Sequence, residues 1–98
     1  MRIRLANSQD LETIARFSRA LAIDSADKVP DEKPVRRGIA RGLERPALCR
    51  YFVAESLTID QAPIGKLMVT YEWTDWRDGI IWWLQSVYVV PEQRGRGV

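Results

Sequence analysis

The sequence contains no histidine and only one cysteine, Cys49. Without histidine, the chain lacks both the commonest metal ligand and the commonest general base at neutral pH. A single cysteine excludes an internal disulfide and any metal site that needs several cysteines. We therefore expect no metal cofactor. Because Cys49 has no histidine partner, we expect it to be a small buried residue rather than a nucleophile.

Long apolar runs are absent as well. No run approaches the roughly 18 apolar residues that a membrane-spanning helix needs. The N-terminal residues, MRIRLANSQD, lack the apolar stretch of a secretion signal. The net charge of +2 is smaller than that expected of a dedicated nucleic-acid binder. These absences predict a cytoplasmic protein whose partner is neither a membrane nor a nucleic acid.

The hydrophobic pattern predicts one small domain that spans residues 1–98. Alternating charged and aliphatic residues indicate a strand at 2–5, and helical spacing of apolar residues indicates helices at 11–22 and 35–43. Three stretches rich in β-branched and aromatic residues are typical of strands: 49–55, 64–74 and 80–90. The order β-α-α-β-β-β predicts an α+β fold in which helices flank an antiparallel sheet.

The segment around the second helix is basic. Seven basic and three acidic residues lie between Lys28 and Arg50. We interpret this as a solvated helix face, with attraction of an acidic ligand as the alternative. Gly38 and Gly42 lie inside the helix, and each costs about 1 kcal/mol relative to alanine, so the helix depends on tertiary contacts.

The last residues, VYVVPEQRGRGV, combine a strand with a glycine-and-arginine loop. Pro91 cannot donate a hydrogen bond to a neighbouring strand, so strand pairing is expected to stop there. Glycines at 95 and 97 leave the main-chain amides free to surround an anion. Arg94 and Arg96 can reach phosphate oxygens. The loop by itself is equally compatible with a flexible Arg/Gly-rich end.

The strand, the proline and the loop together resemble the acetyl-CoA motif of the GNAT acetyltransferase superfamily. That motif is a strand, a short turn and Q/R-x-x-G-x-G/A at the start of a helix. Arg94 and Gly97 match its first and fourth positions, and the sixth would be position 99. The resemblance implies the N-terminal part of a GNAT-like domain that is incomplete at its C-terminus, with the chain ending inside the motif.

The resemblance also implies where acetyl-CoA binds. The main chain of Val87, Tyr88 and Val89 would run beside the pantetheine arm, and a bulge near Val87–Val89 would open the sheet there. The amides from Arg94 to Val98 would hold the pyrophosphate, and the N–H around Val89 would stabilise the oxyanion. The implied cofactor-binding residues are Val87, Tyr88, Val89, Arg94, Gly95, Arg96, Gly97 and Val98.

The chemistry needs a group that removes a proton from the acceptor amine. Many relatives have a glutamate where this sequence has Gln85, which cannot titrate and can only orient a water. Glu72 is our alternative base, because partial burial between Tyr71 and Trp73 would raise its pKa. We expect the four tryptophans in the core or at an interface, with a substrate pocket as the alternative: Trp73, Trp76, Trp82 and Trp83.

The resemblance therefore predicts an N-acetyltransferase that moves an acetyl group from acetyl-CoA to a small-molecule or peptide amine in a ternary complex. We expect the 98-residue chain to be inactive alone. A non-catalytic acyl-CoA-binding or regulatory module is the alternative, and Gln85 favours it. The outer edge of the strand at 80–90 would be open, so we also expect a homo-oligomer, such as a dimer, through this edge.

Overall fold

The expected order of elements is confirmed. The structure, a computed structural model, describes residues 1–26 and 29–95. Its strands are β1 (Arg2–Leu5), β2 (Cys49–Glu55), β3 (Pro63–Thr74) and β4 (Gly79–Val89), and its α-helices are α1 (Leu11–Ala26) and α2 (Glu32–Leu43). Short 3-10 helices, η1 (Ser8–Asp10) and η2 (Pro91–Gln93), precede α1 and follow β4.

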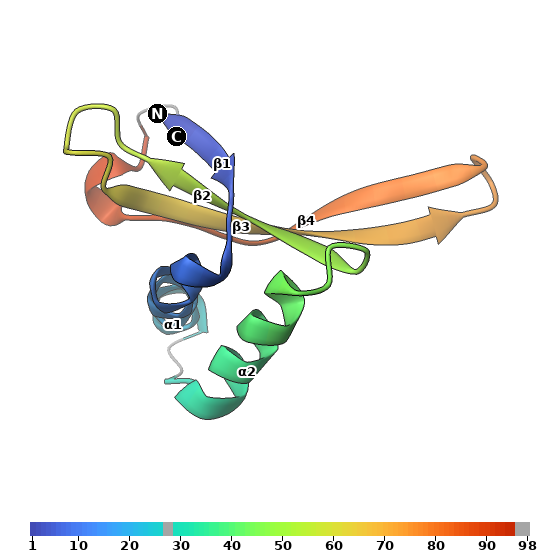
Figure 1. Ribbon diagram of the computed structural model, residues 1–98, viewed down its shortest axis with the longest axis horizontal. Coiled ribbons are helices and arrows are strands. Elements are labelled where there is room, and N and C mark those ends of the chain that lie inside the picture. Colours follow the sequence, from blue (N-terminus) through green and yellow to red (C-terminus); the bar gives the residue numbers. More distant parts are fainter. Residues whose placement is uncertain (27–28, 96–98) are drawn as a thin grey trace.

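The strands form one antiparallel sheet in the order β1-β2-β3-β4. Both α-helices lie in the connection between β1 and β2, and both cover the same face of the sheet (Figure 1). The expectation of an antiparallel sheet with helices is confirmed, with both helices on one side of it. Among the described residues, large apolar side chains stay exposed on the other face, including Ile3, Leu5 and Leu84.

The core lies between the helices and the covered face of the sheet. Ile14 of α1, Ile39 of α2 and Tyr51 and Val53 of β2 form its centre. Val53 and Ile14 are completely buried, because a strand residue facing a helix stripe is enclosed from both layers. Ile14 and Ile39 both lie within the helices that the apolar spacing predicted.

The start of α1 is fixed by polar contacts. The Asn7 side chain accepts a hydrogen bond from the Gln9 amide, and the Asp10 carboxylate accepts one from the Asn7 amide, which forms a capping box. The Arg4 guanidinium binds Asp10 through two hydrogen bonds of 2.8 Å and Glu55 through one of 3.0 Å. These contacts tie β1, β2 and the helix start together.

Beyond the last β2–β3 pair, Cys49 with Thr70, β3 and β4 continue as a two-stranded ribbon. Figure 1 shows this ribbon extending far from the helices. Its four tryptophans are exposed, and Trp76 at the turn is 95% exposed. The expected place in the core is therefore wrong, because neither helix reaches the ribbon, and the expected place at an interface stays a prediction.

Candidate functional site

A bulge interrupts β4 close to the position that the sequence indicated. Lys66 pairs with Tyr88, but Met68 pairs with Gln85, so Ser86 and Val87 together face the single residue Leu67. Ser86 adopts a positive φ of 54°, which is unusual for a residue with a side chain. The bulge therefore lies at Ser86–Val87, at the start of the expected range, and redirects the following strand residues.

Gly65 of β3 allows β4 to come close just after the bulge. A Cβ atom at Gly65 would lie 2.7 Å from the carbonyl oxygen of Tyr88, closer than real Cβ atoms come. Gly65 is therefore a point of close approach between β3 and β4. This glycine keeps the C-terminal half of β4 in register with β3 after the extra residue.

A groove of about 300 Å³ lies between the end of α1 and the C-terminal half of β4. Its walls are Leu21, Asp24, Ser25, Val87, Tyr88, Val89 and Arg94. Four of the expected cofactor residues thus line one groove, although they were inferred from a motif alone. Among the described residues β4 has no neighbour other than β3, so its outer edge borders this groove.

Arg94 connects the loop after β4 to the groove. Its Nε donates to the Val89 carbonyl at 2.8 Å, and a terminal nitrogen lies 3.0 Å from Asp24 of α1. Its guanidinium also lies 5.3 Å from the centre of the Tyr88 ring. We expected this side chain to reach phosphate oxygens, but it is directed at Val89 and Asp24, where the carboxylate neutralises it.

The loop itself begins as the motif requires. Pro91 starts η2, and the Arg94 amide donates to the Pro91 carbonyl at 3.3 Å. Gly95 has a φ of +79°, a conformation that favours glycine. Arg96, Gly97 and Val98, which were also expected to bind the cofactor, lie outside the described residues.

Tyr88 and Lys66 face the helices from paired positions on β4 and β3. The Tyr88 ring packs against Phe17 of α1 with 5.3 Å between ring centres, so its side chain serves packing. Lys66 is only 4% exposed, and this burial lowers its pKa to about 8. Sequence reasoning missed Lys66, although its alternation with Ile64 and Met68 could have indicated the covered face.

The two candidate catalytic residues lie on the same face of β3 and β4. Gln85 donates from Nε2 to Thr70 Oγ1 at 2.6 Å, and Glu72 accepts from Trp83 Nε1 at 3.3 Å. Thr70 pairs with Trp83, so both contacts belong to one row of neighbours. The expected partial burial of Glu72 is wrong. Its side chain is exposed, because β2 pairs with β3 only as far as Thr70 and does not extend to Glu72.

Other chemistries find no support in the described part of the chain. Burial raises the pKa of the Cys49 thiol, whose Sγ donates to the Gly42 carbonyl at 3.5 Å, so a reactive thiolate is disfavoured. Residues 1–26 and 29–95 contain no group of three or more potential metal ligands. None of the helices in these ranges is long and apolar enough to cross a membrane.

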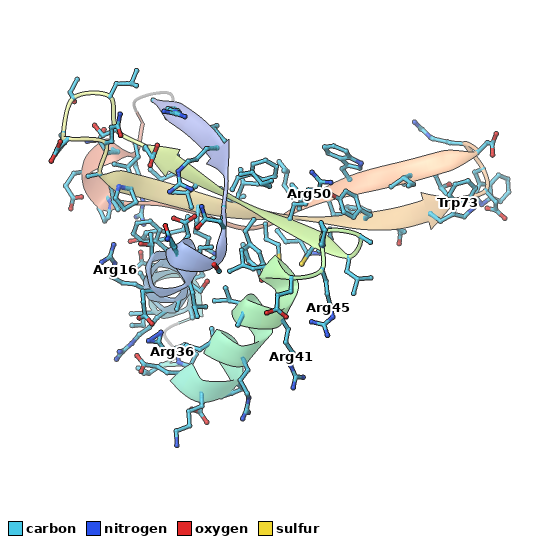
Figure 2. All side chains as sticks on the ribbon, viewed as in Figure 1. Arg16, Arg36, Arg41, Arg45, Arg50 and Trp73 are labelled. Carbon is cyan, nitrogen blue, oxygen red and sulfur yellow. The ribbon has the colours of Figure 1, made fainter. Side chains whose placement is uncertain are left out.

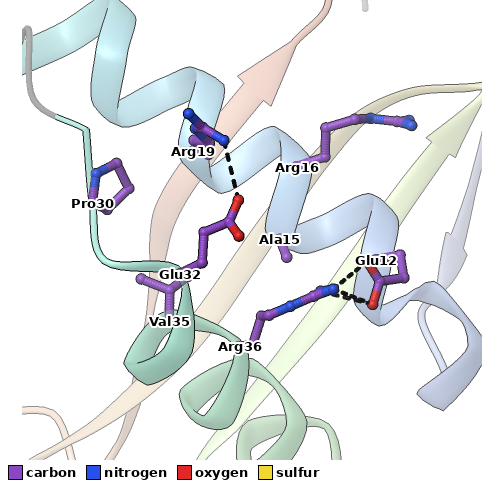
Figure 3. Close-up of a pocket in the computed structure, with 8 residues that line it drawn as sticks. All are labelled: Glu12, Ala15, Arg16, Arg19, Pro30, Glu32, Val35 and Arg36. Atoms are coloured by element: carbon purple, nitrogen blue, oxygen red, sulfur yellow. Dashed lines mark hydrogen bonds and ion pairs between the residues drawn. The ribbon is translucent and has the colours of Figure 1, made fainter.

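A second hollow, of about 140 Å³, lies between α1 and α2 (Figure 3). Arg36 of α2 binds Glu12 of α1, and Arg19 of α1 binds Glu32 of α2 at 3.1 Å. These ion pairs join the helices across the hollow. We assign this hollow to helix packing, because its walls contain none of the residues that the motif indicated.

Comparison with solved structures identifies the fold. A protein from Clostridium difficile 630 described as a possible acetyltransferase aligns with a TM-score of 0.86 and 38% identity over 98% of this chain and 61% of its own. A predicted acetyltransferase with acetyl-CoA from Clostridium acetobutylicum aligns with a TM-score of 0.78 and 19% identity, over 99% and 64%. A GCN5-related N-acetyltransferase from Ralstonia eutropha JMP134 aligns with a TM-score of 0.74 and 19% identity, over 98% and 66%.

The chain therefore has the GNAT fold that the resemblance implied. It spans about three fifths of the length of these structures. A scan against models of protein families finds no match, and a search of curated proteins finds none either. The bulged strand and the groove beside it thus belong to a fold found in named acetyltransferases.

Proposed function

We propose that this protein is an N-acetyltransferase that transfers the acetyl group of acetyl-CoA to an amine in a ternary complex. One observation carries the proposal: the free edge of a bulged strand borders a groove that also receives the first residues of the glycine-and-arginine loop. The pantetheine arm would lie along Val87–Val89, and the amides from Arg94 to Val98 would hold the pyrophosphate. The acceptor would approach from the side of Gln85.

In this reaction the amine nitrogen attacks the thioester carbonyl, the C–S bond breaks, and the leaving thiolate takes up a proton. A lysine-like amine with a pKa of about 10.4 is mostly protonated at pH 7, a deficit of about 4.6 kcal/mol. We propose that Gln85 orients a water that takes the proton from the amine, and Glu72 is the alternative base. The N–H around Val89 would stabilise the oxyanion.

The proposal is tested by titrating acetyl-CoA into the chain and by measuring CoA thiol release with a panel of small and peptide amines. We expect residues 1–98 to bind acetyl-CoA more weakly than the longer related proteins do and not to turn it over, because they span about three fifths of the related structures. The longer related proteins should turn it over. Gly95→Val should weaken binding about tenfold or more, because a β-branched residue resists a φ of +79°.

Gly38→Ala is the matched control, since it changes an exposed glycine far from the groove. Equal binding of acetyl-CoA by the Gly95→Val variant and the parent chain would contradict the proposed pyrophosphate loop. Absence of any acetyl-CoA binding would contradict the proposed function as a whole.

A non-catalytic acyl-CoA-binding or regulatory module is the second candidate. Two observations favour it: Gln85 cannot titrate, and Glu72 is exposed on the ribbon rather than enclosed near the bulge. Binding of acetyl-CoA without turnover by any amine, also in a longer relative with the same Gln85 and Glu72, would favour the module over the enzyme.

We further propose that the protein acts in the cytoplasm and self-associates through the outer edge of β4. Support for self-association comes from the sequence of this strand. From Gly79 to Val90 it contains no charged residue, and charged side chains are the usual protection of an exposed strand edge.

A further inference from the structure

The outer face of α2 carries a row of arginines. Arg37, Arg41 and Arg45 follow one another at four-residue spacing along α2 and the turn after it, and all three are exposed. Among the residues that the structure describes, no ion pair joins any of them to a carboxylate. Figure 2 shows Arg41 and Arg45 pointing away from the sheet.

Two arginines at the contact between α1 and α2 do have carboxylate partners. Arg36 has Glu12 as its partner, and Arg19 has Glu32 (Figure 3). At the contact between the two helices, these two arginines thus each have a carboxylate partner, although both ion pairs are exposed. Within residues 1–26 and 29–95, the row Arg37–Arg41–Arg45 has no such partner, although like charges four residues apart destabilise a helix by about 0.2–0.5 kcal/mol per pair.

The helix dipole explains only part of this row. A cation in the last turn is favourable, and Arg45 donates to the Arg41 carbonyl at 3.0 Å, so Arg41 and Arg45 stabilise the helix end. Arg37 lies one turn earlier and gains little from the dipole. Stabilisation of α2 by the helix dipole therefore does not explain why all three positions are arginine.

Gly38 is a second and independent observation on the same face. It is exposed in the middle of the helix, and a Cβ atom built there has nothing within 4 Å. Packing therefore does not require glycine, which costs about 1 kcal/mol relative to alanine. Gly38 is three residues from Arg41, so the two share one side of α2, and Arg45 follows in the turn after the helix. A glycine there lets another backbone approach closely.

This face ends next to the strands that carry the candidate catalytic residues. Leu43 and Cys49, at the end of α2 and the start of β2, pack against the same core cluster. Cys49 pairs with Thr70, and Thr70 accepts the hydrogen bond from Gln85. An acceptor that reaches Gln85 can therefore extend over the C-terminal end of α2.

We propose that Gly38, Arg41 and Arg45 form a docking surface for an extended acidic peptide that carries the acceptor amine. Arg41 lies in the last turn of α2 and Arg45 in the turn after it, about one helical turn or 6 Å further on. Alternate side chains of an extended peptide are about 6.7 Å apart, so two acidic residues at i and i+2 can pair with Arg41 and Arg45. This inference rests on the proposed acetyltransferase function and selects a peptide among its acceptors.

A nucleic acid fits the surface less well. Single-stranded nucleic acids bind where aromatic side chains interleave with basic ones. Here Trp73, Trp76 and Trp82 lie on the ribbon and Trp83 lies at its base opposite Thr70, whereas Arg41 lies on α2 and Arg45 in the turn after it. Figure 2 shows Trp73 at the far end of the ribbon, away from Arg41 and Arg45.

The test measures the fluorescence anisotropy of a labelled ten-residue peptide with a free N-terminal amine and glutamates at alternate positions. R41Q/R45Q should weaken its binding by about fivefold or more, the effect of roughly 1 kcal/mol of charge pairing. R2Q/R77Q removes the same charge from exposed positions on β1 and the hairpin turn, and it should change binding less than about twofold. Gly38→Leu should also weaken binding, without lowering the melting temperature.

Three results would overturn the docking surface. The two double variants could lose the same peptide affinity, the affinity could stay unchanged when glutamine replaces the peptide glutamates, or the peptide could fail to bind at all. Tighter binding of a single-stranded oligonucleotide than of the peptide would assign the surface to another class of partner and overturn it too. Titration of acetyl-CoA into the same proteins separates the two hypotheses. A parent chain that does not bind acetyl-CoA contradicts the proposed function. Equal peptide affinity of R41Q/R45Q and R2Q/R77Q contradicts only this inference.

Discussion

Lys66 is the residue whose burial has the clearest energetic consequence. It is 4% exposed on the helix-covered face of β3, paired with Val53 on one side and Tyr88 on the other. Removing its ammonium group from water disfavours the charged form and lowers the pKa to about 8 from an ordinary 10.5. The folded chain therefore holds this proton less tightly than the unfolded chain does.

We predict that Lys66→Met stabilises the fold at pH 7 by about 1–3 kcal/mol, because it removes the cost of a buried charge. Between pH 8 and 10.5 the unfolded state binds more protons at position 66, so the parent chain should gain stability as the pH rises. The variant should lack this gain. Urea unfolding at pH 7 and pH 10 measures both effects, and a variant less stable at both pH values would contradict the assignment.

Asp10 has the opposite dependence on pH. The Arg4 guanidinium, through its hydrogen bonds, holds the pKa of the Asp10 carboxyl below its ordinary 3.8. Its contribution to stability is present above this value and is lost as the pH falls through the lower folded pKa.

We predict that Asp10→Asn lowers the free energy of unfolding at pH 7 by about 2–3 kcal/mol, since Arg4 loses a charged partner and the capping box is weakened. The difference from the parent chain should shrink when the pH drops below 3.8. Asp75→Asn at the exposed hairpin turn serves as the control. Equal effects of the two substitutions would argue against a special role for the Arg4–Asp10 pair.

At the scale of elements, α2 contains two glycines with different surroundings. Gly38 has open space around it, whereas a Cβ atom at Gly42 would lie 2.9 Å from Tyr51 Cε2 and 3.0 Å from Cys49 Sγ. Gly42 thus lets the end of α2 rest on β2. The sequence predicted the same destabilising effect for both glycines, because no neighbouring residue within the helix distinguishes them.

We predict that Gly38→Ala raises the free energy of unfolding by about 0.5–1 kcal/mol and that Gly42→Ala lowers it by about 1–3 kcal/mol. The first change restores helix propensity, and the second forces Tyr51 and Cys49 to move. Thermal unfolding followed by circular dichroism compares the pair directly. Stabilisation by both substitutions would show that α2 does not pack on β2 as described.

At the scale of the whole molecule, the helices protect one side only. The long dimension of 43 Å reflects the ribbon that leaves the body. Large apolar side chains on β4, such as Trp82 and Leu84, are exposed beside an edge that has no partner among the described residues. Such a surface favours association with another chain.

We predict that the parent chain sediments as a dimer or larger species at high concentration and that Leu84→Lys shifts it to the monomer, because a lysine at the edge must lose its hydration on association. Leu57→Lys is the matched control, since Leu57 is 68% exposed and Leu84 is 69% exposed. Sedimentation equilibrium of all three proteins measures the effect. A monodisperse parent monomer would contradict the proposed self-association.

Local sequence determined the secondary structure and many of the points where its helices and strands begin and end. The bounds of β2, the Asn7 and Asp31 caps, the end of pairing near Pro91 and the glycine conformation at 95 follow from signals within a few residues. The resemblance in the last residues also indicated the strand that lines the groove, because a motif is itself a local pattern.

Only the tertiary structure decided burial and side-chain direction. Glu72 is exposed because β2 ends before it, Lys66 is buried because α1 lies over that row, and Arg94 is directed at Asp24 of a helix far away in the sequence. Both helices cover one face because one connection carries both of them. Each outcome depends on which distant segment lies opposite, and that information is absent from the spacing of neighbouring residues.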